Sequence, residues 1–138
     1  MADLKSVLLI DDNRSTNFLH TRILRNSGLV ANIHAVTSAQ AGLDYLTTAG
    51  SDANYPCPDL VFLDINMPGM NGWEFLEAYK QLPKTQCADV VVVMLTTSLN
   101  PDDQRKAGQY DLIREFLYKP LSVDKLRSLI DNHFMTAE

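Results

Sequence analysis

The sequence has few cysteines and no long hydrophobic run. Only two cysteines, Cys57 and Cys87, occur in 138 residues, and neither has a histidine or a second cysteine nearby at the spacing of a metal site. We therefore expect two reduced thiols rather than a disulfide scaffold or a zinc site. The longest apolar run, Val90–Leu95, has six residues, whereas a membrane-spanning helix needs about 18 or more.

A signal peptide and a basic stripe are also missing. Only four consecutive apolar residues, Val7–Ile10, precede two aspartates near the N-terminus, which is not the pattern of a secretory signal. We therefore expect a cytoplasmic protein without membrane contact. Lysine and arginine total 12 against 17 acidic residues, a net charge of −5, and the basic residues are scattered. Nucleic-acid-binding domains usually carry a basic stripe, so we expect no direct nucleic-acid binding.

The overall composition is that of an ordinary globular domain. Hydrophobic residues make up 46% of the chain and charged residues 21%, which excludes disorder and collagen-like repeats. A length of 138 residues is close to the commonest size of one domain. We find no repeat, low-complexity tract or linker. We therefore expect one domain over residues 1–138 and no second domain.

Short apolar runs alternate with segments of helical period along the chain. We expect strands at Ser6–Ile10, Val30–Val36, Leu60–Leu63, Val90–Leu95 and Arg114–Tyr118. We expect helices at Arg14–Asn26, Ala39–Thr48, Trp73–Leu82, Pro101–Ala107 and, after the N-cap Ser122, through Phe134. In the first of these helices, the helical spacing predicts an apolar face made of Phe18, Leu19, Ile23 and Leu24, with Thr16 and His20 beside them. The segments Gly50–Pro58 and Ile65–Gly72 are rich in proline and glycine, which favours loops.

Three of the expected strands are continuously apolar rather than alternating. They are Val7–Ile10, Leu60–Leu63 and Val90–Leu95. Such strands are buried on both faces, as in a parallel sheet with helices on each side. Because crossovers between parallel strands are right-handed, the pattern predicts an open, doubly wound α/β domain of five strands and five helices.

Polar side chains follow four of these strands at the point where each strand ends. The first ends in Asp11-Asp12, the third in Asp64, the fourth in Thr96 and the fifth in Lys119. In an open parallel sheet, ligands bind beyond the carboxyl ends of the strands. We therefore expect these side chains to form one site.

The residue types at this edge predict a chemistry. Clustered carboxylates repel one another unless a cation lies among them, and a set of oxygen ligands suits Mg²⁺. Mg²⁺ typically takes one or two carboxylates, which leaves an aspartate free as a nucleophile that can form an acyl phosphate. Lys119 and the Thr96 hydroxyl can stabilise the charge on phosphoryl oxygens. The site therefore predicts phosphoryl transfer to an aspartate.

The same residues resemble the receiver domains of two-component response regulators over essentially the whole chain. The resemblance rests on Asp11-Asp12, Asp64, the loop Asn66–Gly72, Thr96 and Lys119-Pro120, in this order. It implies a flavodoxin-like fold, a doubly wound five-stranded parallel sheet of order 2-1-3-4-5 with five helices. It also implies a stand-alone receiver without an output domain, which catalyses only its own aspartyl phosphorylation and dephosphorylation.

The resemblance assigns a role to each matched residue. Asp64 would be the phosphoacceptor, and Asp11, Asp12, Asp64 and the backbone carbonyl of Asn66 would hold Mg²⁺. Thr96 and Lys119 would contact the phosphoryl group. The donor would be a sensor histidine kinase or a phosphotransfer protein. The signal would leave through the fourth helix, fifth strand and fifth helix, toward a separate downstream protein or a second copy of this chain.

Two positions depart from the commonest receiver pattern. Phe116 stands where many receivers have a switch tyrosine, so its ring can move inward with Thr96 but offers no hydroxyl to a partner. Thr97 follows Thr96 where smaller residues are more usual, which restricts access to the phosphoryl group slightly. Neither departure removes a group that the chemistry needs.

Three other functions fit the residues less well. A phosphatase with an aspartyl-phosphate intermediate usually needs a second acid two residues after the nucleophile, and positions 13 and 66 are both asparagine. A flavin-binding electron carrier needs a phosphate-binding loop after the first strand, where this chain has Asp11-Asp12. A pseudo-receiver adaptor would lack part of the site. The histidines His20, His34 and His133 are interpreted as structural or surface residues.

Overall fold

The computed structural model describes residues 4–48, 56–82 and 91–134. Five strands are present in this part of the chain: β1 (Leu4–Ile10), β2 (Val30–Val36), β3 (Leu60–Leu63), β4 (Val91–Thr96) and β5 (Ile113–Tyr118). They alternate with five helices: α1 (Arg14–Ser27), α2 (Ala39–Thr47), α3 (Gly72–Lys80), α4 (Pro101–Ala107) and α5 (Val123–His133). Every expected element is found, and its ends differ from the expectation by at most two residues.

The five strands form one parallel sheet of order β2-β1-β3-β4-β5. The expected fold class, a flavodoxin-like doubly wound sheet with five helices, is therefore confirmed. Ile10 of β1 pairs with Leu63 of β3, and Leu63 pairs with Met94 of β4. This register brings the carboxyl ends of the three central strands to nearly the same level.

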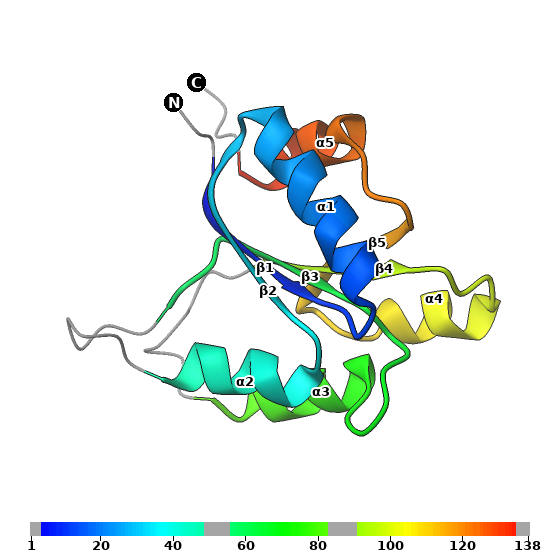
Figure 1. The fold of residues 1–138 in the computed structure, drawn as a ribbon. Coiled ribbons are helices and arrows are strands. Elements are labelled where there is room, and N and C mark those ends of the chain that lie inside the picture. Colours follow the sequence, from blue (N-terminus) through cyan, green and yellow to red (C-terminus); the bar gives the residue numbers. More distant parts are fainter. Residues whose placement is uncertain (1–3, 49–55, 83–90, 135–138) are drawn as a thin grey trace.

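Helices cover both faces of the sheet (Figure 1), with α1 and α5 on one side and α2, α3 and α4 on the other. Side chains alternate along each central strand between two hydrophobic cores. One core, toward α2, α3 and α4, contains the strand residues Leu8, Ile10, Val61, Leu63, Val92 and Met94. The other, toward α1 and α5, contains Val7, Leu9, Leu60, Phe62, Val93 and Leu95. The continuous apolar runs therefore correspond to strands buried on both faces.

The α1 helix corrects one expectation from the sequence. Phe18 and Leu19 are 66% and 47% exposed, so they do not form the buried face of the helix. Instead the helix buries Asn17, His20 and Leu24. Two polar side chains can occupy this face because both have backbone partners in the protein interior.

Two further expectations fall wholly or partly outside the described residues. Cys87 lies in the range 83–90, so the prediction of two thiols is not tested for the pair. Most of the expected loop Gly50–Pro58 lies in the range 49–55. Among the helices of the described residues, none combines the length and the apolar character needed to cross a membrane.

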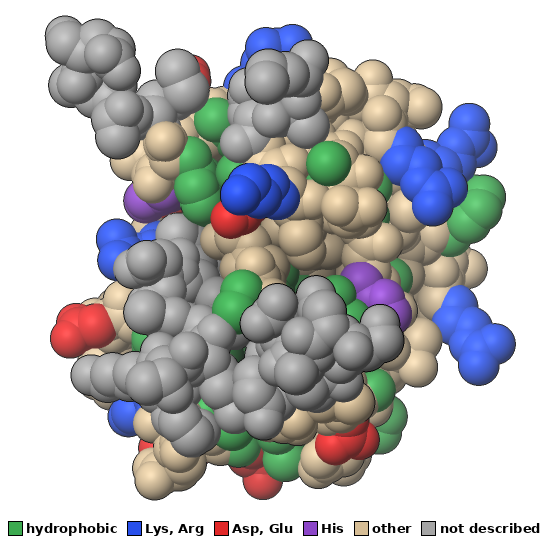
Figure 2. Space-filling view, turned by 90° about the vertical axis from the view of Figure 1, so that its left-hand side faces the viewer, with side chains coloured by type: hydrophobic (Ala, Val, Ile, Leu, Met, Phe, Trp, Pro, Cys, Tyr) green, Lys and Arg blue, Asp and Glu red, His purple; other side chains and the backbone are tan. Residues whose placement is uncertain are grey.

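The surface charge agrees with the composition. On the face seen in Figure 2, the Lys and Arg side chains of the described residues lie as separate groups rather than as one continuous stripe. This distribution fits the net charge of −5.

Candidate functional site

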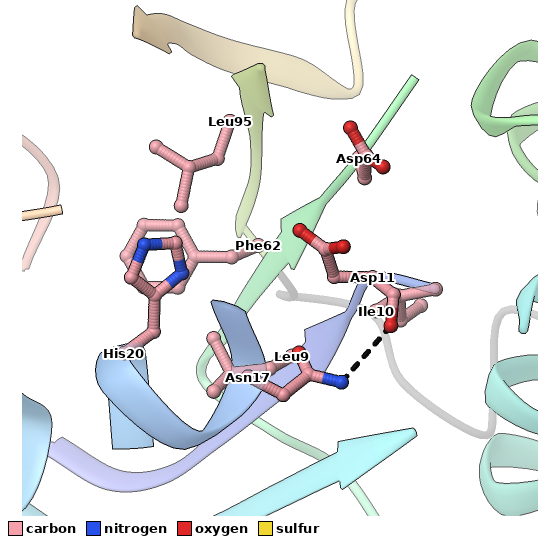
Figure 3. Close-up of a pocket in the computed structure, with 8 residues that line it drawn as sticks. All are labelled: Leu9, Ile10, Asp11, Asn17, His20, Phe62, Asp64 and Leu95. Atoms are coloured by element: carbon pink, nitrogen blue, oxygen red, sulfur yellow. Dashed lines mark hydrogen bonds between the residues drawn. The ribbon is translucent and has the colours of Figure 1, made fainter. Parts of the chain in front are cut away.

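Two carboxylates extend the central strands directly into the site. Asp11 follows β1 and Asp64 follows β3, and the backbone N–H of Asp64 donates to the carbonyl of Ile10 at 3.0 Å. The two residues are only 5% and 8% exposed. Figure 3 shows both side chains at the ends of neighbouring strands. The parallel register thus brings together two acids that are far apart in the sequence.

Asp12 completes an acidic cluster at this edge. One carboxylate oxygen from each of Asp11, Asp12 and Asp64 lies within 4.8 Å of the others. Asp11 and Asp64 are buried, whereas Asp12 is exposed. The backbone turns sharply here, because the Asn13 N–H donates to Asp11 Oδ1 at 2.9 Å and the Asn13 side chain caps α1. The cluster therefore opens to solvent on the Asp12 side.

Lys119 reaches the two buried carboxylates from the end of β5. Its Nζ lies 2.5 Å from Asp11 Oδ2 and 3.4 Å from Asp64 Oδ1. Its backbone N–H donates to the carbonyl of Thr96 at 2.8 Å, which joins the ends of β4 and β5. The ammonium group is therefore held between the acids that the sequence predicts to work with it.

Burial and the repulsion from a neighbouring acid raise the pKa of Asp64. Desolvation and the neighbouring Asp11 raise the pKa of Asp64 to about 6, against a smaller opposing effect of Lys119. One lysine therefore does not compensate for three acids. A further cation would relieve this repulsion, and the donor set consists only of oxygens, so the residues fit Mg²⁺ and offer no nitrogen or sulfur ligand for zinc.

Thr96 is buried beside the cluster at the end of β4, with 1% exposure. Its Oγ1 accepts a hydrogen bond from the Ser98 N–H at 2.9 Å. The Ser98 hydroxyl in turn donates to Asp103 of α4 at 2.5 Å. Thr96 is therefore connected through Ser98 to the helix that follows it.

The backbone after Asp64 packs too closely for an ordinary side chain. A Cβ on Gly72 would lie 2.5 Å from the carbonyl oxygen of Asp64, and the Gly72 N–H donates to the Ile65 carbonyl at 2.8 Å. Directly before Gly72, Asn71 forms a capping box with Glu74 at the start of α3. This packing places the first turn of α3 against the segment that carries the acid.

The remaining predicted residues lie near this centre. Phe116 is half-buried on β5, packs against the core under α4 and meets the Tyr118 ring edge-on at 5.7 Å. Asn66 is exposed in the loop two residues after Asp64. Its backbone carbonyl remains a predicted metal ligand.

Two buried polar residues lie behind the acids: Asn17, which sequence reasoning missed, and His20, which it interpreted only as a structural or surface residue. Asn17 Nδ2 donates to the carbonyls of Asp11 and Val36 at 2.9 and 3.1 Å. His20 Nε2 accepts from the Leu121 N–H at 3.3 Å. The sequence contains a signal for this buried polar face, because Asn17 and His20 are three residues apart and therefore lie on the same face of a helix.

Fold and site together define an open α/β domain with an acidic pocket at the carboxyl edge of its sheet. The family model of the response regulator receiver domain matches residues 7–131. The chain therefore belongs to the response regulator receiver domain family, whose members take part in two-component signalling.

Named relatives agree with this assignment. The chain is 31% identical over 125 residues to the probable methanogenesis regulatory protein FilR2 of Methanothrix harundinacea, covering 91% of this chain and 78% of that protein. A two-component response regulator from Cytophaga hutchinsonii superposes with a TM-score of 0.84 and 38% identity, covering 94% of this chain and 96% of that one. The phosphorylated cyanobacterial phytochrome response regulator RcpA superposes with a TM-score of 0.73 and 30% identity, covering 97% and 96%.

Proposed function

We propose that this receiver accepts a phosphoryl group on Asp64 from a histidine kinase or a phosphotransfer protein. The observation that carries the proposal is the cluster of Asp11, Asp12 and Asp64 with the Lys119 ammonium between the two buried acids. Asp64 is the proposed acceptor because it combines burial, a raised pKa and contact with Lys119. Receiver family membership and the phosphorylated state of RcpA support the same role.

The transfer needs positioning and charge stabilisation more than covalent chemistry from the protein. A carboxylate oxygen of Asp64 forms a bond to phosphorus, and the bond from phosphorus to the donor's histidine nitrogen breaks. The electron pair stays on that nitrogen, and because the other ring nitrogen of the phosphohistidine carries a proton, the leaving group is a neutral imidazole. Lys119 and the Thr96 hydroxyl then donate to phosphoryl oxygens. The receiver acts on no other substrate and is in this sense not an enzyme.

Mg²⁺ belongs to this proposal. Asp11, Asp12, Asp64 and the Asn66 backbone carbonyl would hold the ion. When bound, it would neutralise part of the charge on the acids and on the incoming phosphoryl oxygens. The raised pKa of Asp64 supports the need for such a cation.

We infer that the phosphorylated state is recognised on the face formed by α4, β5 and α5. To donate a hydrogen bond to the phosphoryl group, the Thr96 side chain would move toward Asp64 and carry with it the Oγ1 that accepts from the Ser98 N–H. Because Ser98 is bonded to Asp103 of α4, this movement would alter the loop before that helix. The half-buried Phe116 ring can fill space that Thr96 leaves, and burying its exposed part contributes only a fraction of the roughly 1.5–3 kcal/mol for a whole side chain. A separate protein or a second copy of this chain would bind the altered face.

Intact mass spectrometry tests the proposal. Wild type treated with acetyl phosphate and Mg²⁺ should gain one phosphoryl group, and Asp64→Asn should gain none. Asp111→Asn, which changes an exposed acid away from the cluster, is the matched control and should be modified like wild type. Phosphorylation of Asp64→Asn at the wild-type rate would defeat the assignment.

A further inference from the structure

The backbone that carries Lys119 is fastened on both sides. Before the side chain, the Lys119 N–H donates to the Thr96 carbonyl at the end of β4. Two residues later, the Leu121 N–H donates to His20 Nε2 at 3.3 Å, a buried contact between residues 101 positions apart. Thr96 of β4 and His20 of α1 thus hold the two ends of the segment Lys119–Leu121.

Lys125 of α5 holds the carbonyl groups of the same segment. Its Nζ donates to the carbonyl of Tyr118 at 2.7 Å and to the carbonyl of Pro120 at 2.9 Å. These two carbonyls flank Lys119 on either side. Together with the His20 and Thr96 contacts, they hold the backbone of this segment, and with it the point from which the Lys119 side chain reaches the acids.

His20 suits the task of accepting a hydrogen bond. The residue is 2% exposed, and burial lowers its pKa, as do the charges of Lys119 and Lys125. The ring is therefore neutral at pH 7, and because Nε2 accepts, Nδ1 carries the proton. A protonated ring would have no acceptor for the Leu121 N–H.

The same face of α1 also holds the backbone of Asp11, the acid that pairs with Lys119. Asn17, one turn before His20, donates to the Asp11 carbonyl at 2.9 Å (Figure 3). Asp11 Oδ2 is the closest carboxylate partner of the Lys119 Nζ among the described residues. One helix therefore holds the backbone of the acid directly and the backbone of the lysine through Leu121.

We propose that His20 and Lys125 are positioning residues for phosphoryl transfer, which keep the Lys119 ammonium between Asp11 and Asp64 by fastening the backbone around it. This inference rests on the proposed function of Asp64. In the described part of the chain neither residue forms a hydrogen bond or an ion pair with the acidic cluster, so both would act mainly through Lys119.

The first experiment compares His20→Gln with His20→Asn. Glutamine presents its amide oxygen where Nε2 lies, whereas asparagine is one methylene too short, so the pair differs only in reach. We expect His20→Asn to slow phosphorylation by acetyl phosphate ~10-fold or more, because a displacement of about 1 Å can cost ~100-fold in rate. His20→Gln should stay within about threefold of wild type.

Lys125→Met tests the same proposal from the other helix. It should slow phosphorylation in the same direction, with Lys5→Met as the matched control at the opposite end of the sheet. Neither His20→Asn nor Lys125→Met should weaken Mg²⁺ binding, measured by calorimetry, since neither residue is an expected ligand and a displaced ammonium removes a competing positive charge from Asp11 and Asp64. A purely structural defect would not separate the rate from Mg²⁺ affinity in this way. Circular dichroism establishes that each variant is folded.

NMR spectra of lysine side chains provide a readout independent of phosphorylation. The Lys119 Cε signal, assigned with Lys119→Arg, should differ from those of solvated lysines in wild type and His20→Gln. It should move toward them in His20→Asn and Lys125→Met. If wild type accepts no phosphoryl group, the proposed role of Asp64 is wrong. The Lys119 Cε signal alone then tests whether His20 and Lys125 position the ammonium. Unchanged signals in both variants, unchanged rates in both, or a glutamine variant as slow as the asparagine variant would overturn the inference.

Discussion

Replacing Asp64 by asparagine should stabilise the metal-free protein. Asp64 is nine-tenths buried beside Asp11, and this environment raises its pKa from 3.8 to about 6. The folded state therefore binds a proton at Asp64 more tightly than the unfolded state does. It follows that ionising Asp64 costs folding free energy above pH 6, and that this cost disappears as the pH falls toward 4.

The size of this stabilisation follows from the pKa shift of Asp64. A difference of about two pKa units at 1.36 kcal/mol per unit corresponds to ~3 kcal/mol. This value already includes the attraction of Lys119, because the pKa compares the charged and neutral forms in the same surroundings. Asparagine is neutral but is not identical to the protonated acid, so ~3 kcal/mol is a ceiling and a gain of ~1–3 kcal/mol is expected.

Urea denaturation in EDTA, followed through the single tryptophan, Trp73, measures this gain. The difference in unfolding free energy between Asp64→Asn and wild type should be largest at pH 7.5, should fall to about a third of that value near pH 4.5 and should disappear below the unfolded pKa of 3.8. Mg²⁺ should then stabilise wild type more than the variant, because binding favours the folded state. Asp111→Asn controls for the loss of an exposed acid. A variant no more stable than wild type at pH 7.5, or a gain that does not depend on pH, would refute the reasoning.

Four further substitutions should have separable effects. Gly72→Ala should destabilise by ~2–3 kcal/mol in urea denaturation, because its Cβ would lie 2.5 Å from the Asp64 carbonyl oxygen. Asn71→Ala should cost only ~1 kcal/mol in the same assay, the usual contribution of an N-cap. Asp12→Ala should weaken Mg²⁺ binding strongly in calorimetry, and equal binding would remove the proposed site. Thr96→Ala should abolish the NMR shift changes that beryllofluoride causes on the face of α4, β5 and α5, while leaving those around Asp64.

The sheet could be predicted because its central strands carry a simple local signal. Leu60–Leu63 and Val92–Leu95 are apolar without alternation and are buried, as strands with helices on both faces must be. Once the sheet is parallel, the residues that end its strands meet at one edge. The predicted meeting of Asp11, Asp64 and Lys119 therefore required no knowledge of side-chain packing.

The face that α1 buries could not be predicted in the same way. Hydrophobicity favours burying Phe18 and Leu19, yet both are exposed, and Arg22 lies over the Phe18 ring at 5.9 Å. Periodicity assumes that polar side chains face water. It fails where a buried polar side chain has a hydrogen-bond partner that is distant in the sequence.

The polar face of α1 shows why this failure falls close to the acidic site. Strand ends beyond the sheet leave backbone groups without ladder partners, and buried groups of this kind must be paired. Asn17 pairs with the carbonyls of Asp11 and Val36, and His20 with the Leu121 N–H. Apolar residues at these two positions would satisfy the periodicity, and the Val36 carbonyl would keep the bond that it accepts from the Asp11 N–H. The Asp11 carbonyl and the Leu121 N–H would lose these partners, at a cost of ~1–3 kcal/mol each. The helix thus gives up apolar burial for hydrogen bonds to the two segments that carry Asp11 and Lys119, which is the arrangement expected if α1 serves to hold that ion pair in place.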